Sequence, residues 1–329
     1  MKLAGKKVLV TGAGGFLGSH LVEALVRTGC KVRAFVHYNS RNDWGMLELV
    51  DKKTLDQVEV ISGDIRDSDG ARKIMKDQEV VFHLAALIGI PYSYVNPLDV
   101  ADTNIQGTLN LLLAGKEHGV EKFVHTSTSE VYGTAQHVPM DENHPVNPQS
   151  PYAATKASAD QLALSFHYTY GLPVGIIRPF NIYGPRQSAR SVIPNIIMQA
   201  LTADELKMGS VSTSRDLTYV TDSVEGFIQF AECDQTVGQI VNLGSENEIS
   251  VKHLIELTEK SLNKKLKIVE EEKRIRPEKS EVQRLVSDSK KAKRLFQWKP
   301  QIEIEEGIQK TISWIKNNID FYKKEIYNI

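Results

Sequence analysis

The first half of the chain alternates short runs of β-branched residues with longer segments of helical periodicity. Strands and helices that alternate in this way form a parallel sheet with helices on its faces, because each crossover between parallel strands needs a connection of about helix length. The pattern therefore predicts an α/β fold built on a doubly wound parallel sheet. The expected strands span residues 7–10, 32–36, 58–61, 80–83, 123–126 and 174–178, and the expected helices span residues 18–28, 71–76, 100–118 and 151–170.

A cluster of glycines connects the first expected strand to the first expected helix. From Thr11 to Gly18 it reads Thr-Gly-Ala-Gly-Gly-Phe-Leu-Gly. Glycine lets the backbone turn sharply and approach a pyrophosphate closely, and the start of a helix attracts negative charge. A tight turn also favours glycine, but the flanking strand and helix together predict a dinucleotide site of the Rossmann type. The residues expected to touch the cofactor here are Gly12, Gly15, Phe16, Leu17 and Gly18.

The end of the second expected strand bears on the choice between NAD and NADP. An acid there would hold the free ribose hydroxyls of NAD, but the chain has no acid before Asp43. Ser40 and Arg41 are suited to a 2′-phosphate, which favours NADP. The alternative is a solvated loop in which Arg41 holds no ligand, and NAD then remains open. The residues expected around the adenosine are His37, Ser40, Arg41, Asp64 and Ile65.

A smaller unit is expected after the sixth strand. Beyond residue 180 the alternation becomes irregular, and a strand expected at residues 240–243 returns the chain to the main sheet. We therefore expect residues 1–180 to form a dinucleotide-binding Rossmann domain, to which the chain returns around residues 217–244. Residues 181–329 are expected to form a smaller, mixed substrate domain that ends in a helix.

Composition excludes several classes of protein. Of the 329 residues, 41% are hydrophobic and 25% are charged, and the formal net charge of -1 argues against a nucleic-acid or membrane surface. The first strand starts too close to Met1 for a signal peptide, so none is expected. The two cysteines, Cys30 and Cys233, show no metal-ligand spacing. We expect a cytoplasmic protein that binds neither nucleic acid nor membrane and has no metal site.

Tyr152 and Lys156 lie four residues apart in the helix expected at residues 151–170. Positions i and i+4 share a helix face, so the ammonium is expected to lower the pKa of the phenol from roughly 10 toward neutrality. A phenolate takes the proton of a sugar hydroxyl while a nicotinamide takes the hydride. Such pairs are often inert surface residues, but this one follows the fifth strand, downstream of the glycine cluster. We expect both residues to be catalytic and to contact the cofactor.

Thr128, Ser129 and Glu130 follow the fifth strand, and ligands bind at the carboxyl ends of strands in open α/β sheets. Thr128 is expected to hydrogen-bond the hydroxyl that is oxidised. Glu130 is expected to remove a proton α to the new ketone, a step that simple alcohol oxidation does not need. The structural alternative is a carboxylate that caps a turn. This additional carboxylate indicates oxidation followed by elimination.

Arginines on separate downstream segments are expected to bind a diphosphate. Each alone is an ordinary surface residue or ion-pair partner, but several guanidinium groups that converge hold a diphosphate through bidentate hydrogen bonds. The expected substrate ligands are Thr128, Asn181, Arg186, Arg215 and Arg276.

Together these motifs resemble the extended short-chain dehydrogenases that act on nucleotide sugars. The resemblance covers essentially the whole chain, and it includes the glycine cluster, the run at residues 126–133, the Tyr/Lys pair and the segments at residues 63–67, 83–86, 104–111, 178–186 and 215–220. It implies a tightly bound cofactor that is recycled in each turnover and that also contacts Leu84, Ala85 and Ala86. It further implies a homodimer whose four-helix bundle is formed by residues 100–118 and 151–170 of both chains.

Within this family the chain is most similar to the sugar-nucleotide 4,6-dehydratases, since epimerases usually lack an acid at the position of Glu130. Many dTDP-glucose dehydratases carry, at the position of Ser129, an Asp that protonates the departing C6 hydroxyl, whereas GDP-mannose dehydratases carry Ser. The general acid is therefore either Glu130 or a water. The catalytic residues that the resemblance implies are Thr128, Ser129, Glu130, Tyr152 and Lys156.

The overall pattern looks most similar to bacterial dehydratases that act on nucleotide-linked N-acetylglucosamine in legionaminic acid synthesis. The resemblance therefore implies an NAD(P)-dependent lyase that converts GDP- or UDP-N-acetylglucosamine to its 4-keto-6-deoxy product. Two alternatives share the oxidation step, a 4-epimerase and a decarboxylase of the UDP-glucuronate type. A non-catalytic NADP-sensing protein is a third, although such proteins often lose the tyrosine or the lysine.

Overall fold

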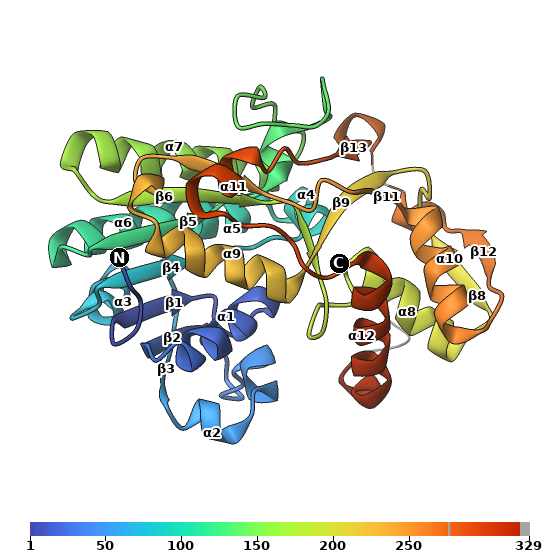
Figure 1. Ribbon diagram of the computed structural model, residues 1–329, viewed down its shortest axis with the longest axis horizontal. Coiled ribbons are helices and arrows are strands. Elements are labelled where there is room, and N and C mark those ends of the chain that lie inside the picture. Colours follow the sequence, from blue (N-terminus) through green and yellow to red (C-terminus); the bar gives the residue numbers. More distant parts are fainter. Residues whose placement is uncertain (276, 323–329) are drawn as a thin grey trace.

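The computed structural model describes residues 1–275 and 277–322, and its largest element is a parallel sheet of seven strands (Figure 1). The strands lie in the order β10-β6-β5-β4-β1-β2-β3. This confirms the α/β class and the doubly wound sheet. The strands are β1 (Lys7–Thr11), β2 (Lys31–His37), β3 (Val58–Gly63), β4 (Val80–His83), β5 (Lys122–Thr126), β6 (Val174–Pro179) and β10 (Ile240–Leu243).

Helices cover both faces of this sheet because successive strand residues point to opposite sides. On β1, Leu9 packs in the cluster that contains α3, α6 and α7, whereas Val8 and Val10 pack in the cluster that contains α1 and α9. All of these strand residues are fully buried. The helices are α1 (Phe16–Arg27), α3 (Ser68–Met75), α6 (Gly107–His118), α7 (Pro151–Tyr170) and α9 (Val220–Glu232).

Local chemistry sets the limits of α7. The side chain of Ser150 caps the helix by accepting a hydrogen bond of 3.1 Å from the N–H of Ala153, and Pro151 occupies the first position, where its missing N–H costs nothing. The helix ends at Gly171, whose φ of 68° is the left-handed conformation that glycine adopts freely. These caps hold Tyr152 in the first turn and Lys156 in the next.

Several of the remaining elements build a second region around β9. In this region β9 pairs with β7 and β13 in parallel and with β11 in antiparallel orientation, while β8 and β12 form a separate parallel pair. The other elements are α2 (Lys52–Leu55), α4 (Ile90–Val95), α5 (Pro97–Ala101), β7 (Asn181–Tyr183), α8 (Val192–Thr202), β8 (Glu205–Met208), β9 (Ser214–Tyr219), β11 (Glu248–Ser250), α10 (Val251–Leu262), β12 (Lys267–Glu270), β13 (Arg284–Leu285), α11 (Lys290–Phe296) and α12 (Ile304–Asn317).

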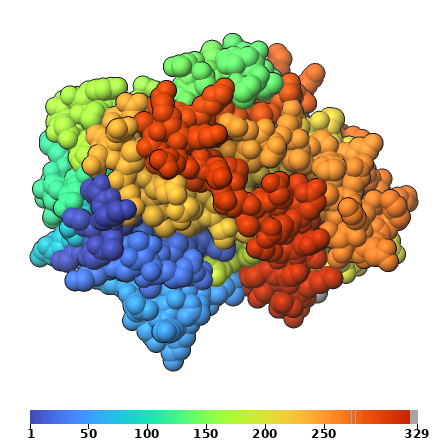
Figure 2. Space-filling model, viewed as in Figure 1, coloured from blue at the N-terminus to red at the C-terminus, as the bar shows by residue number. Residues whose placement is uncertain are grey.

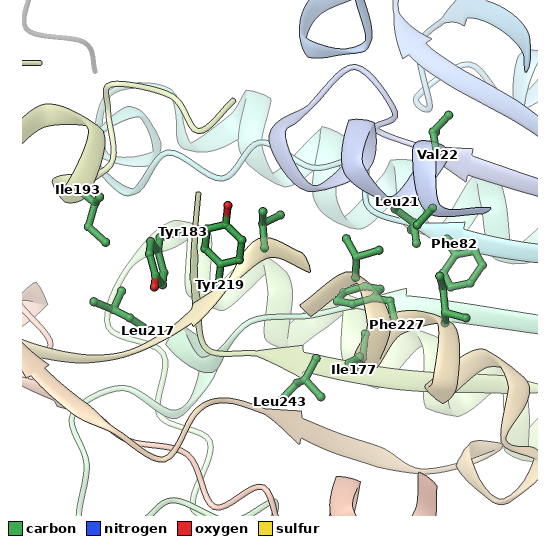
Figure 3. Close-up of a cluster of buried hydrophobic side chains, with 14 of the residues drawn as sticks. Leu21, Val22, Phe82, Ile177, Tyr183, Ile193, Leu217, Tyr219, Phe227 and Leu243 are labelled. Atoms are coloured by element: carbon green, nitrogen blue, oxygen red, sulfur yellow. The ribbon is translucent and has the colours of Figure 1, made fainter. Parts of the chain in front are cut away.

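One hydrophobic cluster joins the two regions. It extends from Phe82 and Ile177 in the main sheet, through Phe227 on α9, to Tyr183 and Leu217 in the second region (Figure 3). In the space-filling view, the C-terminal segments in orange and red lie directly against the yellow and green segments of the chain (Figure 2). The cluster therefore packs the main sheet and the second region against each other.

A buried carboxylate ties the second region to the main sheet. Asp216 on β9 is fully buried and accepts hydrogen bonds from the N–H and the hydroxyl of Ser245 and from the N–H groups of Glu246 and Ser287, at 2.6–3.0 Å. Burial raises the pKa of Asp216 to about 6, and these donors oppose the rise. The carboxylate thus links β9 to the turn after β10 and to the segment after β13.

Replacing Asp216 by Ala is expected to lower the free energy of unfolding by about 2–4 kcal/mol, because three N–H groups lose their buried acceptor. The measurement is urea denaturation at pH 7.5, above the pKa of about 6. The control is Asp234→Ala, whose carboxylate pairs with the N-terminal amine and is 84% exposed. It should leave the free energy of unfolding unchanged within the error of the measurement. Equal effects of the two substitutions would show that Asp216 does not hold the regions together.

Candidate functional site

The glycine turn after β1 forms a cradle that side chains would close. Gly12 has a φ of 73°, and a Cβ atom there would lie 2.7 Å from the backbone nitrogen of Ala85. A Cβ atom on Gly18 would overlap the carbonyl oxygen of Gly12. Among the described residues, no side chain caps the start of α1, where Gly15 is the N-cap. The open N–H groups at this helix start suit a pyrophosphate, so the residues present fit a dinucleotide.

The segment after β4 forms the opposite side of this cradle. Leu84 and Ala85 donate backbone hydrogen bonds to the carbonyl and hydroxyl oxygens of Thr11, at 3.2 and 3.3 Å. The ring of His83 lies between the hydroxyls of Thr11 and Thr108, each 2.9 Å away. Burial holds the pKa of His83 well below its usual value, so the ring is neutral. His83 therefore joins β1, β4 and α6 and is not a base.

The residues expected around the adenosine lie at the ends of β2 and β3. Arg41 is 83% exposed and forms an ion pair of 3.2 Å with Asp43. Asp64 forms an ion pair of 2.6 Å with Arg66, whose hydrogen bonds are the main cause that lowers the pKa of Asp64. His37 and Ser40 are exposed and Ile65 is buried.

A short 3-10 turn after β5 presents Glu130. Thr128 caps this turn, since its hydroxyl accepts a hydrogen bond of 3.2 Å from the N–H of Glu130. Val131 and Tyr132 of the turn are fully buried, whereas Glu130 is partly exposed. Ser129 is buried and is not among the residues that line the neighbouring cavity. Ser129 and Glu130 are neighbours in the sequence, but only Glu130 lines the cavity.

A cavity of about 390 Å³ lies between this edge of the sheet and the second region. Thr128, Glu130, Tyr152 and Asn181 line it together. They come from the end of β5, from α7 and from β7, so the fold brings one phenol and one carboxylate to the same space. Basic side chains that also line the cavity are Arg190, Lys207, Arg215 and Arg274.

Burial sets the protonation of the Tyr152 and Lys156 pair. Tyr152 is 7% exposed, and burial raises the pKa of its phenol, with a partly opposing hydrogen bond to Thr128. The charges of Glu130 and Asp160 raise it further. Burial lowers the pKa of Lys156 to about 8, which the charge of Asp160 opposes. The direction for the phenol is opposite to the one expected from the sequence, because helix spacing predicts the neighbouring ammonium but not the loss of solvent.

A buried polar network supports α7 behind the cavity. Asp160, four residues after Lys156, accepts hydrogen bonds from the hydroxyl of Ser127 at 2.7 Å and from the guanidinium of Arg178 at 2.9 and 3.1 Å. A nitrogen of the His125 ring lies 3.2 Å from the same carboxylate. Burial acts to raise the pKa of Asp160, but these partners outweigh it and lower the pKa. The network fixes α7 against β5 and β6.

The structure separates the arginines that the sequence grouped. Arg215 lines the cavity and lies 3.6 Å from Glu281, whereas Arg186 does not line it and forms an ion pair of 3.0 Å with Glu23 on α1. Arg276 lies outside the described residues. Sequence reasoning did not select Arg190 and Arg274, although Arg190 follows the Gly-Pro-Arg segment and Arg274 lies in a charged stretch close to Arg276.

Comparison with known proteins assigns the family. The model of the GDP-mannose 4,6 dehydratase family matches residues 9–311. A UDP-glucuronate 4-epimerase from Thermodesulfobacterium geofontis is 35% identical over 96% of this chain and 98% of its own. A UDP-N-acetyl-alpha-D-glucosaminuronate decarboxylase from Bacillus cytotoxicus is 33% identical over 94% of this chain and 98% of its own.

A solved structure points the same way. The dTDP-glucose 4,6-dehydratase DesIV from Streptomyces venezuelae, with NAD and TYD bound, superposes with a TM-score of 0.87 at 28% identity and covers 96% of this chain and 99% of its own. The relatives thus include dehydratases, epimerases and decarboxylases. This chain belongs to the GDP-mannose 4,6-dehydratase family, within the extended short-chain dehydrogenases.

Proposed function

We propose that the protein is a nucleotide-sugar 4,6-dehydratase. The observation that carries this proposal is that Glu130, Thr128 and Tyr152 line one cavity. A 4-epimerase needs only the phenol and the cofactor for its redox steps, whereas dehydration also needs a group that moves the C5 proton. We assign dinucleotide binding to residues 1–180, with the return around residues 217–244, and substrate binding to the rest of residues 181–329.

The glycine turn, the segment at residues 84–86 and Lys156 are the parts of the chain that would hold the dinucleotide. When bound, the nicotinamide would supply the hydride acceptor for C4 in its oxidised form and the hydride donor for C6 in its reduced form, and the oxidised ring would place a positive charge beside the phenol. That charge opposes the burial that raises the pKa of Tyr152.

Tyr152 removes the proton of the C4 hydroxyl as the C4 hydrogen leaves as hydride, and Thr128 holds that hydroxyl. The ketone at C4 acidifies C5. Glu130 then removes the C5 proton, and hydroxide leaves from C6 as water. C6 regains the hydride that left C4, and C5 regains a proton in place of the one that Tyr152 took from the C4 hydroxyl, so the product is a 4-keto-6-deoxy sugar and one water is the net loss.

We assign the general acid at C6 to Glu130 as well. Ser129 is buried and does not line the cavity, which favours Glu130 over Ser129 for this role. Glu130 lines the cavity, and once it has taken the C5 proton its carboxylic acid can donate that proton to the C6 oxygen. The same carboxylate therefore carries one proton from C5 to the C6 oxygen.

Arg190, Arg215 and Arg274 line the same cavity, and we propose that they bind a diphosphate. The sugar that we propose is N-acetylglucosamine linked to GDP or UDP, as in legionaminic acid synthesis, and this rests on the sequence resemblance. Arg186 and Arg276 complete the set of ligands expected from the sequence, and the ion pair of Arg186 with Glu23 competes with that role.

We propose NADP as the preferred cofactor, since Ser40 and Arg41 stand exposed after β2 with no acid before Asp43. NAD is the alternative, which the NAD bound to DesIV and the Arg41–Asp43 ion pair favour. Titration of the protein with both dinucleotides, followed by tryptophan fluorescence, decides between them.

We further propose a cytoplasmic homodimer joined through α6 and α7. Leu113, Tyr168 and Tyr170 on these helices are exposed apolar or aromatic residues. Elution as a monomer from a calibrated column would contradict the dimer. In the described part of the chain, no helix is long and apolar enough to cross a membrane.

A mass-spectrometric screen tests the proposed activity. The protein is incubated with NAD or NADP and with GDP- or UDP-linked N-acetylglucosamine, glucose, mannose and glucuronate. A 4,6-dehydratase lowers the mass of one of the hexose substrates by one water. Loss of carbon dioxide from the glucuronate substrate would identify a decarboxylase, and an isomer of unchanged mass would identify an epimerase. No change in any substrate would favour the non-catalytic NADP-sensing alternative.

A further inference from the structure

The turn after β7 is attached to the helix that starts at the glycine cradle. His20 on α1 lies with its Nε2 atom 3.0 Å from the carbonyl oxygen of Pro185. Burial and the charge of Arg186 lower the pKa of His20 to about 4, so its ring is neutral and donates this hydrogen bond through its N–H. One residue later, Arg186 forms its ion pair with Glu23. Two successive residues of the turn are thus held by successive turns of α1.

Both the side chain and the backbone of Arg186 are unusually constrained for an arginine. It is 8% exposed, and its φ of 68° lies in the left-handed region that favours glycine. A residue other than glycine keeps this conformation only where its surroundings maintain it. The guanidinium meets Glu23 as an ion pair at 3.0 Å without the geometry of a hydrogen bond. The contact is therefore mainly electrostatic, and exchange of the two charges should preserve it.

The same turn continues into the wall of the cavity. Gln187, Ser188 and Arg190 line the cavity, although Arg186 does not. The carbonyl oxygen of Gln187 accepts a hydrogen bond of 2.9 Å from the hydroxyl of Tyr322. The side-chain amide of Gln187 donates a hydrogen bond of 2.8 Å to the carbonyl oxygen of Ile182. The wall is therefore held from the second region on one side and from α1 on the other.

We infer that Arg186 is a positioning residue that acts through Glu23, fixing the 187–190 wall of the cavity against the cofactor-binding helix. The inference rests on the proposed function, in which the cavity receives a nucleotide sugar and α1 receives the dinucleotide. It gives Arg186 a role different from the direct contact with a diphosphate that the sequence suggests. The two roles make opposite demands on Glu23, because a direct ligand needs no carboxylate on α1.

The experiment compares Arg186→Met, Glu23→Ala and the double variant. Calorimetric titration with UDP and with GDP gives the Kd, and the thermal midpoint reports the fold. Arg186→Met and Glu23→Ala are each expected to weaken binding of the nucleotide that the wild type prefers by about tenfold, and the double variant no further. The exchange Glu23→Arg with Arg186→Glu is expected to recover most of the loss.

Arg27→Met is the matched control. Arg27 pairs at 3.3 Å with the other carboxylate oxygen of Glu23, but it is 66% exposed and does not reach the turn. The Kd of Arg27→Met for the same nucleotide should stay within about twofold of the wild-type value, because an exposed ion pair contributes little.

Three outcomes would overturn the inference. A loss of binding in Arg186→Met that Glu23→Ala does not share would make Arg186 a direct ligand. Tighter binding in Glu23→Ala would mean that the pair restrains Arg186 from the nucleotide. A lower thermal midpoint with unchanged Kd would leave only a structural role. A wild type that binds neither UDP nor GDP would instead overturn the proposed function together with this inference.

Discussion

Tyr152→Phe is expected to lower kcat for sugar dehydration by about 10²- to 10⁴-fold, the usual contribution of a positioned acid or base. Phenylalanine fills the same buried space, so the fold remains, but the hydroxyl that takes the C4 proton is lost. Because oxidation at C4 opens the sequence, water loss and the transient reduction of the cofactor should disappear together. Single-turnover mixing with the substrate found in the mass screen, followed by nicotinamide absorbance and product mass, measures both.

The matched control for this prediction is Tyr168→Phe. It makes the same chemical change on the same helix, but at a side chain that is 74% exposed. Because Tyr168 lies on the proposed dimer face, the two proteins are compared at the same oligomeric state, and the turnover of Tyr168→Phe should then equal that of the wild type. If Tyr152→Phe retained dehydration within tenfold of the wild type, another group would be the base at C4.

Glu130→Gln is expected to stop water loss while C4 oxidation continues. Glutamine keeps the size of the side chain, and the hydroxyl of Thr128 still caps the turn through the backbone N–H of residue 130. The amide, however, does not accept the C5 proton. We expect dehydration to fall by about 10²- to 10⁴-fold. Reduced cofactor should accumulate instead, together with a 4-keto sugar that has lost two hydrogens but no water, and rapid quench with mass analysis detects this ketone.

Glu281→Gln provides the comparison, because Glu281 is a second carboxylate that lines the cavity. It lies 3.6 Å from Arg215, one of the proposed diphosphate ligands, so its loss should change KM and leave oxidation and water loss coupled. A Glu130→Gln enzyme with full dehydration would remove Glu130 from both proton transfers. A variant that fails at oxidation as well would assign Glu130 to an earlier step.

The main sheet and α7 could be predicted from the sequence because their signals are local. The period of β-branched residues marked the strands, and the Ser150 cap and Gly171 bound the helix at residues 151–170, as the structure has it. The helix expected at residues 100–118 is instead divided by a π-helical turn at Asp102–Gln106. There the side chain of Asn104 exchanges hydrogen bonds of 2.8 and 3.0 Å with the backbone of Leu87, a tertiary contact that no local pattern reports.

The residues of the site also fall into those that the sequence predicts and those that it does not. Thr128, Glu130, Tyr152 and Asn181 follow strand ends or a capped helix, so chain order alone predicts that they meet. The arginines lie on long connections, where the position of a side chain depends on its partner. Arg186 pairs with Glu23 and does not line the cavity, whereas Arg190 does. The pKa of Tyr152 also escaped prediction, because burial depends on the packing of the whole molecule.

The position of β10 limits how this protein can be recombined with its relatives. β10 forms the edge of the main sheet beside β6, but β7, α8, β8, β9 and α9 separate the two strands along the chain. A single crossover after residue 180 would leave β6 paired with a strand from a foreign parent. A chimaera that keeps its own sheet must therefore exchange two separate gene segments, and simple fusion at one boundary is a poor route to new sugar preferences in this architecture.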